Sequence, residues 1–302
     1  MFGTSPPRSG PSLRTASRCQ TVPIPSRQEQ GEFRVSKVTS TVTSKGQITI
    51  PKSFRDRLGL SAGDQVTVET LERAAAFVTD VDCALLFPFE AIALPSLWEA
   101  IAGPDEIPFA TWGPNEDRIW GWKDELAAQG LAWYGKLVRK RATLLSPALL
   151  ADLYPGDGNV DDYRRLSVEG DAARVAAALT GGAMRQSMLR EEVGLAGKAG
   201  KGRFERAMIE LQRQLLVTHA GVWEQDAGWA TAMIALTTSV FDVGGRFEPA
   251  AAAAKYLATA LNVTAAELGR AFAWPVADAR TVLDGLVERG AAVEEAGHYR
   301  RQ

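Results

Sequence analysis

The stretch from Val35 to Thr70 limits most strongly what this chain can fold into. Its β-branched run at 37–43 and the alternating polar and apolar residues at 47–50 predict two short strands. Gly46, in the three-residue link between them, can adopt the positive φ that a tight hairpin needs. The segment therefore opens with a β-hairpin.

The same segment continues with a short helix and a third strand. Pro51 suits the first position of a helix, and Gly59 is placed to end it, before a strand at 65–69. Domains below about 40 residues usually need disulfides, a metal or a second subunit to be stable. Cys19 and Cys83 are the only two cysteines and cannot supply a disulfide framework or a structural zinc site. Pairing with a second copy is the remaining solution, so we expect a homodimer.

Charge is distributed unevenly along the chain. Residues 1–34 carry five arginines against two glutamates, a net charge of +3, and residues 35–70 carry +2. Because the whole chain carries −2, the rest has a net charge of −7. A basic front on an acidic body favours a nucleic-acid partner at one end of the chain.

No segment resembles a membrane span or a secretory signal. Residues 1–34 are rich in Pro, Ser and Arg without an apolar stretch, and we interpret them as a disordered basic arm. The most apolar window, Trp229 to Phe241, is shorter than the roughly 20 residues needed to cross a bilayer. We expect a cytoplasmic protein that does not contact a membrane.

The second half of the chain contains two similar patterns of elements. Each has three helices followed by a β-hairpin, within 166–226 and 246–302, which is the order of a winged helix. In the first, Ala220-Gly221 is the expected hairpin turn. The segment at 80–165 holds five of the eight tryptophans and is expected to form its own packed subdomain.

The helix expected from Lys201 to Gln214 has the features of a DNA-recognition helix. Its apolar residues, spaced for one buried face, are Phe204, Ala207, Met208, Leu211 and then Leu215. Basic residues lie on the opposite side or in the preceding Gly/Lys loop: Lys198, Lys201, Arg203, Arg206 and Arg213. The alternative is a solvated face on a structural unit. The helix at 276–289 carries several acidic residues, so we expect it to serve packing instead.

The segment 35–70 resembles the AbrB/MazE/SpoVT family of dimeric DNA-binding domains. The resemblance rests on Thr43-Ser44-Lys45-Gly46-Gln47-Ile48-Thr49-Ile50-Pro51-Lys52, then Arg55-Asp56-Arg57-Leu58-Gly59-Leu60 and Gly63-Asp64. It implies a swapped-hairpin β-barrel whose basic side chains contact DNA. The DNA-binding residues that it implies are Lys45, Lys52 and Arg55, with Lys37 and Arg57 as further candidates. It implies structural roles for Gly46, Pro51, Gly59 and Gly63.

The remainder, from about residue 80 to 302, resembles AlkZ-related, YcaQ-type proteins, a family that includes DNA glycosylases. The resemblance rests on Leu-Phe-Pro-Phe-Glu from Leu86, on Leu-Pro-Ser-Leu-Trp-Glu-Ala from Leu94, and on the paired winged helices. Those glycosylases carry a Gln-x-Gln or Gln-x-Asp motif near the start of their fold. Here Gln212-Arg213-Gln214 and Gln28-Glu29-Gln30 have the letters in other contexts, so a non-catalytic relative is expected.

Other candidate sites carry weaker signals. His219 and His298 stand apart from metal-ligand partners, so we interpret both as structural and expect no metal and no cofactor. The Gly194–Gly202 stretch lacks the Ser or Thr of a phosphate-binding loop. Lys136, with Arg139, Lys140 and Arg141 behind Trp133-Tyr134, could grip phosphate beside a stacking ring, or could be a solvated charge run beside core aromatics.

Together these patterns predict an α+β protein of five parts. They are the arm at 1–34, the hairpin domain at 35–72, the tryptophan-rich subdomain at 80–165 and winged helices at 166–226 and 246–302. The predicted function is that of a dimeric protein that binds double-stranded DNA, as a transcriptional regulator. The alternative is a repair glycosylase that excises alkylated or crosslinked bases.

Overall fold

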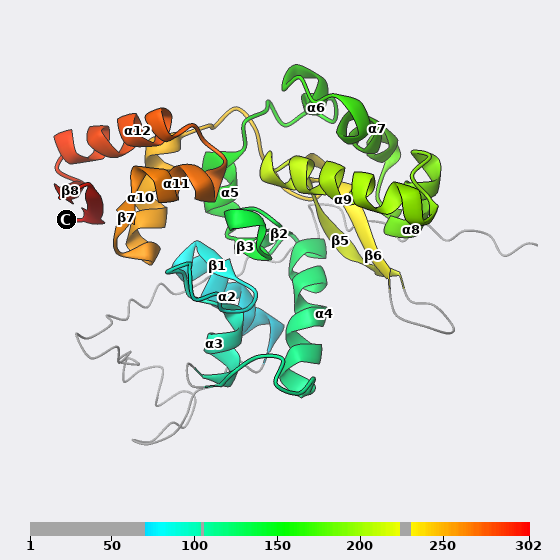
Figure 1. Cartoon of the computed structure of the whole chain (residues 1–302), viewed down its shortest axis with the longest axis horizontal. Coiled ribbons are helices and arrows are strands. Elements are labelled where there is room, and N and C mark those ends of the chain that lie inside the picture. The colour runs from blue at the N-terminus through cyan, green and yellow to red at the C-terminus, as the bar shows by residue number, and fades with distance from the viewer. Residues whose placement is uncertain (1–69, 104–105, 224–230) are drawn as a thin grey trace, which may run out of the picture. The chain divides into compact units, whose positions relative to one another are not determined.

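A computed structural model describes residues 70–302, except 104–105 and 224–230 (Figure 1). The predictions for the arm at 1–34 and for the swapped hairpin at 35–69, with Lys37, Lys45, Lys52, Arg55 and Arg57, lie outside these residues. Helices alternate with three small antiparallel sheets of three strands each, in agreement with the predicted α+β class.

The first part of the described chain packs helices around one of these sheets. The sheet has the order β1-β3-β2, and β1 and β2 both pair antiparallel with β3. Thr70 caps the first helix, and Ser96 forms a capping box with Glu99 at the second. The elements are α2 (Leu71–Val81), β1 (Cys83–Leu85), α3 (Leu97–Ala102), α4 (Pro114–Ala128), β2 (Trp133–Gly135), η1 (Val138–Lys140), β3 (Thr143–Leu145), α5 (Pro147–Leu153) and α6 (Asp162–Arg165).

Two units with the same order of elements follow. Each runs helix, strand, helix, helix, strand, strand, and its first strand pairs with its last, in the orders β4-β6-β5 and β7-β9-β8. The first unit has α7 (Gly170–Ala178), η2 (Leu179–Gly181), β4 (Met184–Arg185), α8 (Gln186–Glu192), α9 (Gly197–Arg213), β5 (Val217–Trp223), β6 (Thr231–Leu236) and the trailing η3 (Thr237–Ser239). The second has α10 (Pro249–Ala260), β7 (Val263–Thr264), α11 (Ala265–Phe272), α12 (Val276–Glu288), β8 (Ala292–Glu295) and β9 (His298–Arg301).

Two details of the first unit correct the sequence-based expectation. The Gly/Lys stretch is not a loop throughout, because α9 already begins at Gly197 and includes Lys198 and Lys201. The helix starts close to the end of α8, and a Cβ on the buried Gly200 would lie 2.2 Å from the carbonyl oxygen of Leu195. Glycine at this position is what allows that approach.

The Ala220-Gly221 pair is not the hairpin turn. Strand β5 continues through it to Trp223, and the pairing register with β6 shifts between His219 and Val222, as at a β-bulge. Gly221 has φ +102°, a value that favours glycine. Because β6 begins at Thr231, the predicted end of this unit at 226 falls short of its last strand.

The predicted buried face of α9 is confirmed, since its apolar residues from Phe204 to Leu211 are all buried. One hydrophobic core runs from β1 through both units, and a second joins α2, α3 and α4 to Tyr134 and Leu144. Cys83 is fully buried. The tryptophans at 98, 122 and 133 are buried, whereas Trp112 and Trp120 are each 46% exposed.

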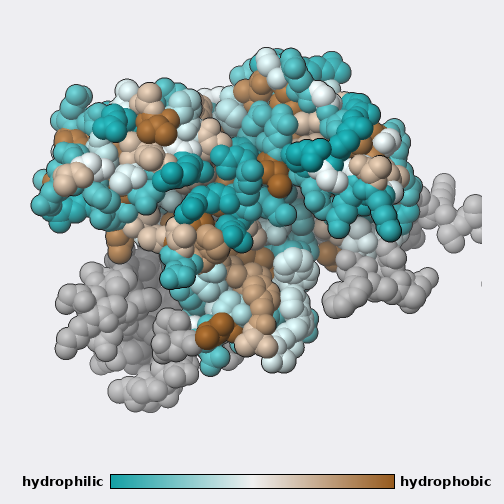
Figure 2. Space-filling model, in the orientation of Figure 1, coloured by the Kyte–Doolittle hydropathy of each residue, from teal (hydrophilic) through white to brown (hydrophobic). Residues whose placement is uncertain are grey.

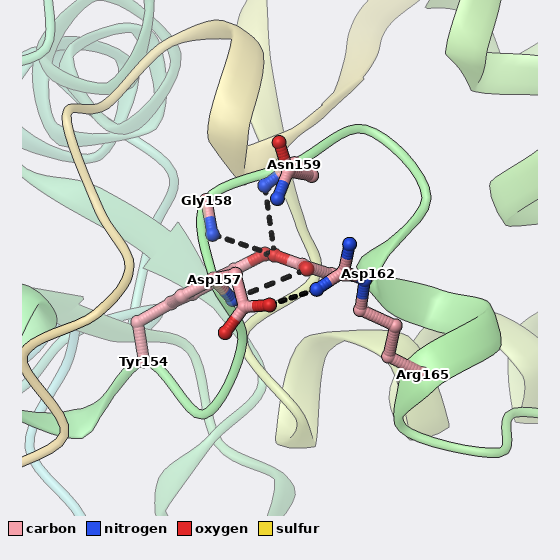
Figure 3. A network of polar contacts seen from close by, with 6 residues as sticks. All are labelled: Tyr154, Asp157, Gly158, Asn159, Asp162 and Arg165. Atoms are coloured by element: carbon pink, nitrogen blue, oxygen red, sulfur yellow. Dashed lines mark hydrogen bonds and ion pairs between the residues drawn. The ribbon is translucent and has the colours of Figure 1, made fainter.

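A buried carboxylate fixes the loop between α5 and α6 (Figure 3). Asp162 is 1% exposed and accepts hydrogen bonds from the Tyr154 hydroxyl and from three backbone N–H groups of the loop, at 2.9–3.1 Å. The loop lies directly against the one before α10, since a Cβ on Gly158 would be 2.2 Å from the carbonyl oxygen of Val243. Asp162 therefore fixes the loop against which the segment before α10 packs.

No helix in the described parts of the chain is long and apolar enough to span a bilayer.

Candidate nucleic-acid interface and adjoining hollow

Of the basic residues predicted on or just before the helix, Lys198, Lys201, Arg203 and Arg206 are solvent-exposed, and Arg213 is half-buried. Lys198 and Lys201 lie in the first turns of α9, and the Lys201 Nζ lies 3.9 Å from the Glu205 Oε1. Arg206 is exposed one turn beyond. Arg203 is exposed too, but its guanidinium donates two hydrogen bonds of 2.8 Å to Asp171 on α7, so it ties the two helices together.

Basic side chains from two segments meet along the exposed flank of α9. Lys140, from η1, borders one hollow with Arg206 and Arg213, while Glu210 contributes a single carboxylate. Arg213 also donates a hydrogen bond of 3.0 Å to the Leu137 carbonyl oxygen, and burial lowers its pKa. Figure 2 shows that the surface over α9 is mostly hydrophilic. We name Lys140, Arg206 and Arg213 the cationic strip.

The other arginines of the predicted basic cluster contact the body of the protein. Arg139 donates a hydrogen bond of 2.7 Å to the Ala91 carbonyl oxygen, and the guanidinium of Arg141 lies 3.7 Å from the ring centroid of Phe89. Trp133 and Tyr134, behind the cluster, are both buried. The prediction of core aromatics beside a charge run therefore describes part of this cluster, and Lys140 belongs to the strip.

A second hollow of about 420 Å³ lies next to the strip, with Ile209 on the wall of both. It is enclosed by side chains from α4, β2, α8, α9, β5 and β6. We call it the lysine hollow. Its wall is formed by Trp120, Lys123, Asp124, Tyr134, Lys136, Gln186, Phe204, Glu205, Met208, Ile209, Gln212, His219, Thr231, Ala232 and Ile234.

Three ionisable side chains meet on that wall. The Lys123 ammonium lies 2.5 Å from Asp124 Oδ2, and His219 Nδ1 contacts the other carboxylate oxygen. Lys123 and Asp124 are each only 4% exposed. The Lys123 nitrogen also lies 4.4 Å from the ring centroid of Trp120 and 5.6 Å from that of Tyr134. The amine is thus enclosed by one carboxylate and two aromatic rings.

The surroundings shift the pKa values of all three groups. Burial lowers the pKa of Lys123, although the charge of Asp124 opposes it. Burial also lowers the pKa of His219 and outweighs the opposing effect of the hydrogen bond to Asp124. Burial alone would raise the pKa of Asp124, but the hydrogen bonds and charges of His219 and Lys123 together hold it below its usual value.

The local fold explains how these residues come together. α4 and β5 lie side by side (Figure 1), which places Asp124 opposite His219 although 95 positions separate them in the sequence. The Thr218 hydroxyl accepts a hydrogen bond from the Tyr134 N–H and donates one to its carbonyl oxygen, at 3.2 and 3.1 Å. This link fixes β2 against β5. The Tyr134 ring packs edge-on to the His219 ring, with 4.6 Å between the two ring centroids.

The Gln212-Arg213-Gln214 sequence does not place its two amides in one site. Gln212 borders the lysine hollow, and its side-chain oxygen accepts a hydrogen bond of 3.1 Å from the Lys136 N–H. Gln214 borders the hollow of the cationic strip, and another beside Trp274. The two glutamines therefore face different cavities.

Sequence reasoning missed Lys123 and Asp124 and treated His219 as an isolated structural residue. Adjacent Lys and Asp on a helix are a common solvent-exposed pattern, and nothing in the local sequence predicts that both are buried. His298, in contrast, is exposed. Among the described residues no group of three or more His, Cys, Asp or Glu side chains is arranged to hold a metal.

The described body is thus an α+β module with two repeated helix–hairpin units and a polar hollow between α4 and the first of them. A family model described as AlkZ related matches residues 68–266, well over half of the chain, and the chain belongs to this family. A second model, described as antidote-toxin recognition MazE, bacterial antitoxin, matches residues 39–75. The chain therefore joins the two kinds of domain that its sequence resembles. No curated protein and no solved structure matches it.

Proposed function

We propose that this protein binds double-stranded DNA as a homodimer and regulates transcription. The observation that carries the proposal is the cationic strip, in which Lys140, Arg206 and Arg213 border one hollow on the exposed flank of α9. Converging lysine and arginine side chains neutralise backbone phosphates, and they supply much of the affinity of DNA-binding proteins. The domains to which the chain is matched support a DNA-binding or DNA-repair-related role.

We further infer that both repeated units are winged helices. Each has the helix, strand, helix, helix, hairpin order of that motif, and α9 occupies the place of the recognition helix in the first. Lys198, Lys201 and Arg206 would then contact DNA from its exposed side. In the second unit α12 carries Asp278, Asp284 and Glu288, so we assign it to packing.

The N-terminal segment supplies the second DNA contact in this proposal. The segment resembles the AbrB/MazE/SpoVT family, and the MazE family model matches residues 39–75. Both findings support a swapped-hairpin dimer that presents a paired basic surface. The residues proposed to contact DNA are Lys37, Lys45, Lys52, Arg55 and Arg57. A dimer doubles each contact, which raises affinity without any change in the individual interactions.

Fluorescence anisotropy with a labelled duplex tests the contribution of the strip. We expect the Lys140→Ala, Arg206→Ala double variant of the full chain to bind about tenfold more weakly than wild type, on all sequences alike. Arg280→Ala is the matched control, because Arg280 is an exposed arginine on the acidic helix α12. Equal affinity of the double variant and wild type would contradict the placement of DNA on α9.

The second candidate is a DNA-repair function, and the lysine hollow favours it. A cavity of about 420 Å³ with buried ionisable groups beside a phosphate-binding surface is the arrangement expected of an enzyme that acts on an extruded nucleotide. Incubation with alkylated or crosslinked duplex, followed by chromatography of the released bases, separates the two candidates. Release of a free base would establish base excision, and intact substrate would exclude it.

A further inference from the structure

The buried amine of Lys123 is an unusual component for a cavity wall. Burying an ammonium group is costly unless it is paired, and an apolar residue of similar size would fill this place at lower cost. Lys123 instead lies on the wall of the lysine hollow, with its nitrogen against one carboxylate and over two aromatic rings. Partial desolvation of this kind is how proteins make a lysine amine nucleophilic.

We propose that Lys123 forms an imine with the aldehyde of an abasic nucleotide in DNA, and that the lysine hollow cleaves the strand there by β-elimination. The inference rests on the proposed binding of DNA by the cationic strip. An abasic nucleotide has an aldehyde in its ring-opened form, and it leaves the helix at little cost because it has no base to unstack or unpair. Ile209 lines both the hollow bordered by the cationic strip and the lysine hollow, so phosphates bound on the strip would flank a sugar in the lysine hollow.

The residues around Lys123 can carry the proton transfers. Lys123 first gives a proton to Asp124, whose Oδ2 lies 2.5 Å away. The neutral amine then bonds to C1′ of the aldehyde, and the carbonyl oxygen takes up one proton from the attacking nitrogen. Asp124 returns its proton to the same oxygen, which leaves as water, and a protonated imine remains, in which carbon and nitrogen are joined by a double bond.

Elimination needs a base, and His219 is placed to be one. Asp124 accepts the Nδ1–H of the neutral ring, so the lone pair is on Nε2. Removal of the C2′ proton forms the C2′–C3′ double bond, and the C3′–O bond breaks with its electron pair on the departing phosphate. Water then adds to the imine carbon, the C–N bond breaks and the lysine amine is regenerated. Asp124 therefore accepts the Lys123 proton in the first step and also positions His219.

Reductive trapping tests the imine directly. The full chain is incubated with a labelled duplex that contains one natural abasic site, in the presence of cyanoborohydride, which reduces the imine to a stable amine. We expect a covalent protein–DNA adduct that mass spectrometry maps to Lys123. Lys123→Arg and Lys123→Gln should lower adduct formation by about 100-fold or more. Lys255→Gln is the control, because this lysine lies on α10, outside the strip and the hollow, and it should react as wild type does.

Further arms separate the roles of the neighbours. His219→Gln should retain trapping but slow strand cleavage by about 100-fold, the usual contribution of a general base. Asp124→Asn should change the pH profile of cleavage. A merely structural role of Asp124 would lower the amount of folded protein and leave the pH profile unchanged. A tetrahydrofuran abasic analogue, which has no aldehyde, should bind without forming an adduct.

The outcomes distinguish this inference from the proposed function. Binding of abasic duplex without an adduct, or an adduct that maps to another amine, would overturn the role of Lys123 and leave DNA binding intact. Absence of binding to any duplex would overturn both. Because the wild-type adduct is mapped by mass, the test does not depend on the folding of the Lys123 variants.

Discussion

Removal of the Asp162 carboxylate should destabilise the body more than any nearby acidic substitution. Asp162→Ala leaves four hydrogen-bond donors without their acceptor, the Tyr154 hydroxyl and three loop N–H groups. An unpaired buried donor costs about 1–3 kcal/mol, and the loop N–H groups can recover part of this from water because the loop is partly exposed. We therefore expect a loss of about 3–4 kcal/mol in the free energy of unfolding.

Urea denaturation followed by tryptophan fluorescence measures this loss. All eight tryptophans lie at position 98 or beyond, so the signal reports on the body and not on the N-terminal segment. The neighbouring Asp161→Ala is the control and should change stability by no more than about 0.5 kcal/mol. A loss below about 1 kcal/mol for Asp162→Ala, or an equal loss for Asp161→Ala, would refute the role of the buried carboxylate.

Three further predictions follow from the glycine contact in α9, the ionisable groups of the lysine hollow and the N-terminal basic residues. Gly200→Ala should destabilise the body by about 1–3 kcal/mol, because the new Cβ would overlap the Leu195 carbonyl. Gly202→Ala should stabilise the body by up to about 1 kcal/mol, because alanine has the higher helix propensity and its Cβ has room here. Equal effects of the two variants in thermal melts would contradict this reasoning. Because folding lowers the pKa of His219, the unfolded chain binds more protons than the folded chain as the pH falls through 6.5, so the free energy of unfolding should decrease there. In a plot of the urea midpoint against pH, His219→Gln should reduce this decrease, and Asp124→Asn should reduce the decrease below pH 3.8. Lys45→Ala with Arg55→Ala should weaken duplex binding and lower its salt slope by about two per chain, and an unchanged slope would exclude these residues as phosphate contacts.

Much of the body could be predicted from short-range patterns in the sequence. The apolar spacing from Phe204 to Leu211 predicts the buried face of α9, and similar periodicity predicts the three helices and the final hairpin of both repeated units. The sequence does not predict the two-residue strands β4 and β7, which are too short to show a periodic pattern. The start of α9 could not be predicted in this way, because glycine normally disfavours a helix and the reason for Gly200 is a contact with Leu195. Ala220-Gly221 predicts a turn although the structure has a bulge there, because turns and bulges use the same residue types.

The candidate site was predicted only where charge is visible in the local sequence. The basic residues of α9 stand out by composition, and the structure adds that Lys140, from another element, meets Arg206. The Lys123–Asp124–His219 group depends on the pairing of α4 with β5, a contact between distant segments. Its members follow no local motif, so only the fold brings them into view.

The salt dependence of duplex binding by the full chain tests the central claim most directly. If two copies neutralise phosphates through the N-terminal basic residues and the cationic strip, the logarithm of the association constant should fall linearly with the logarithm of salt concentration. The slope should be about −5 or steeper, since each phosphate contact contributes about −0.9. Weak binding with a slope near zero would contradict an account in which paired cationic surfaces hold the duplex.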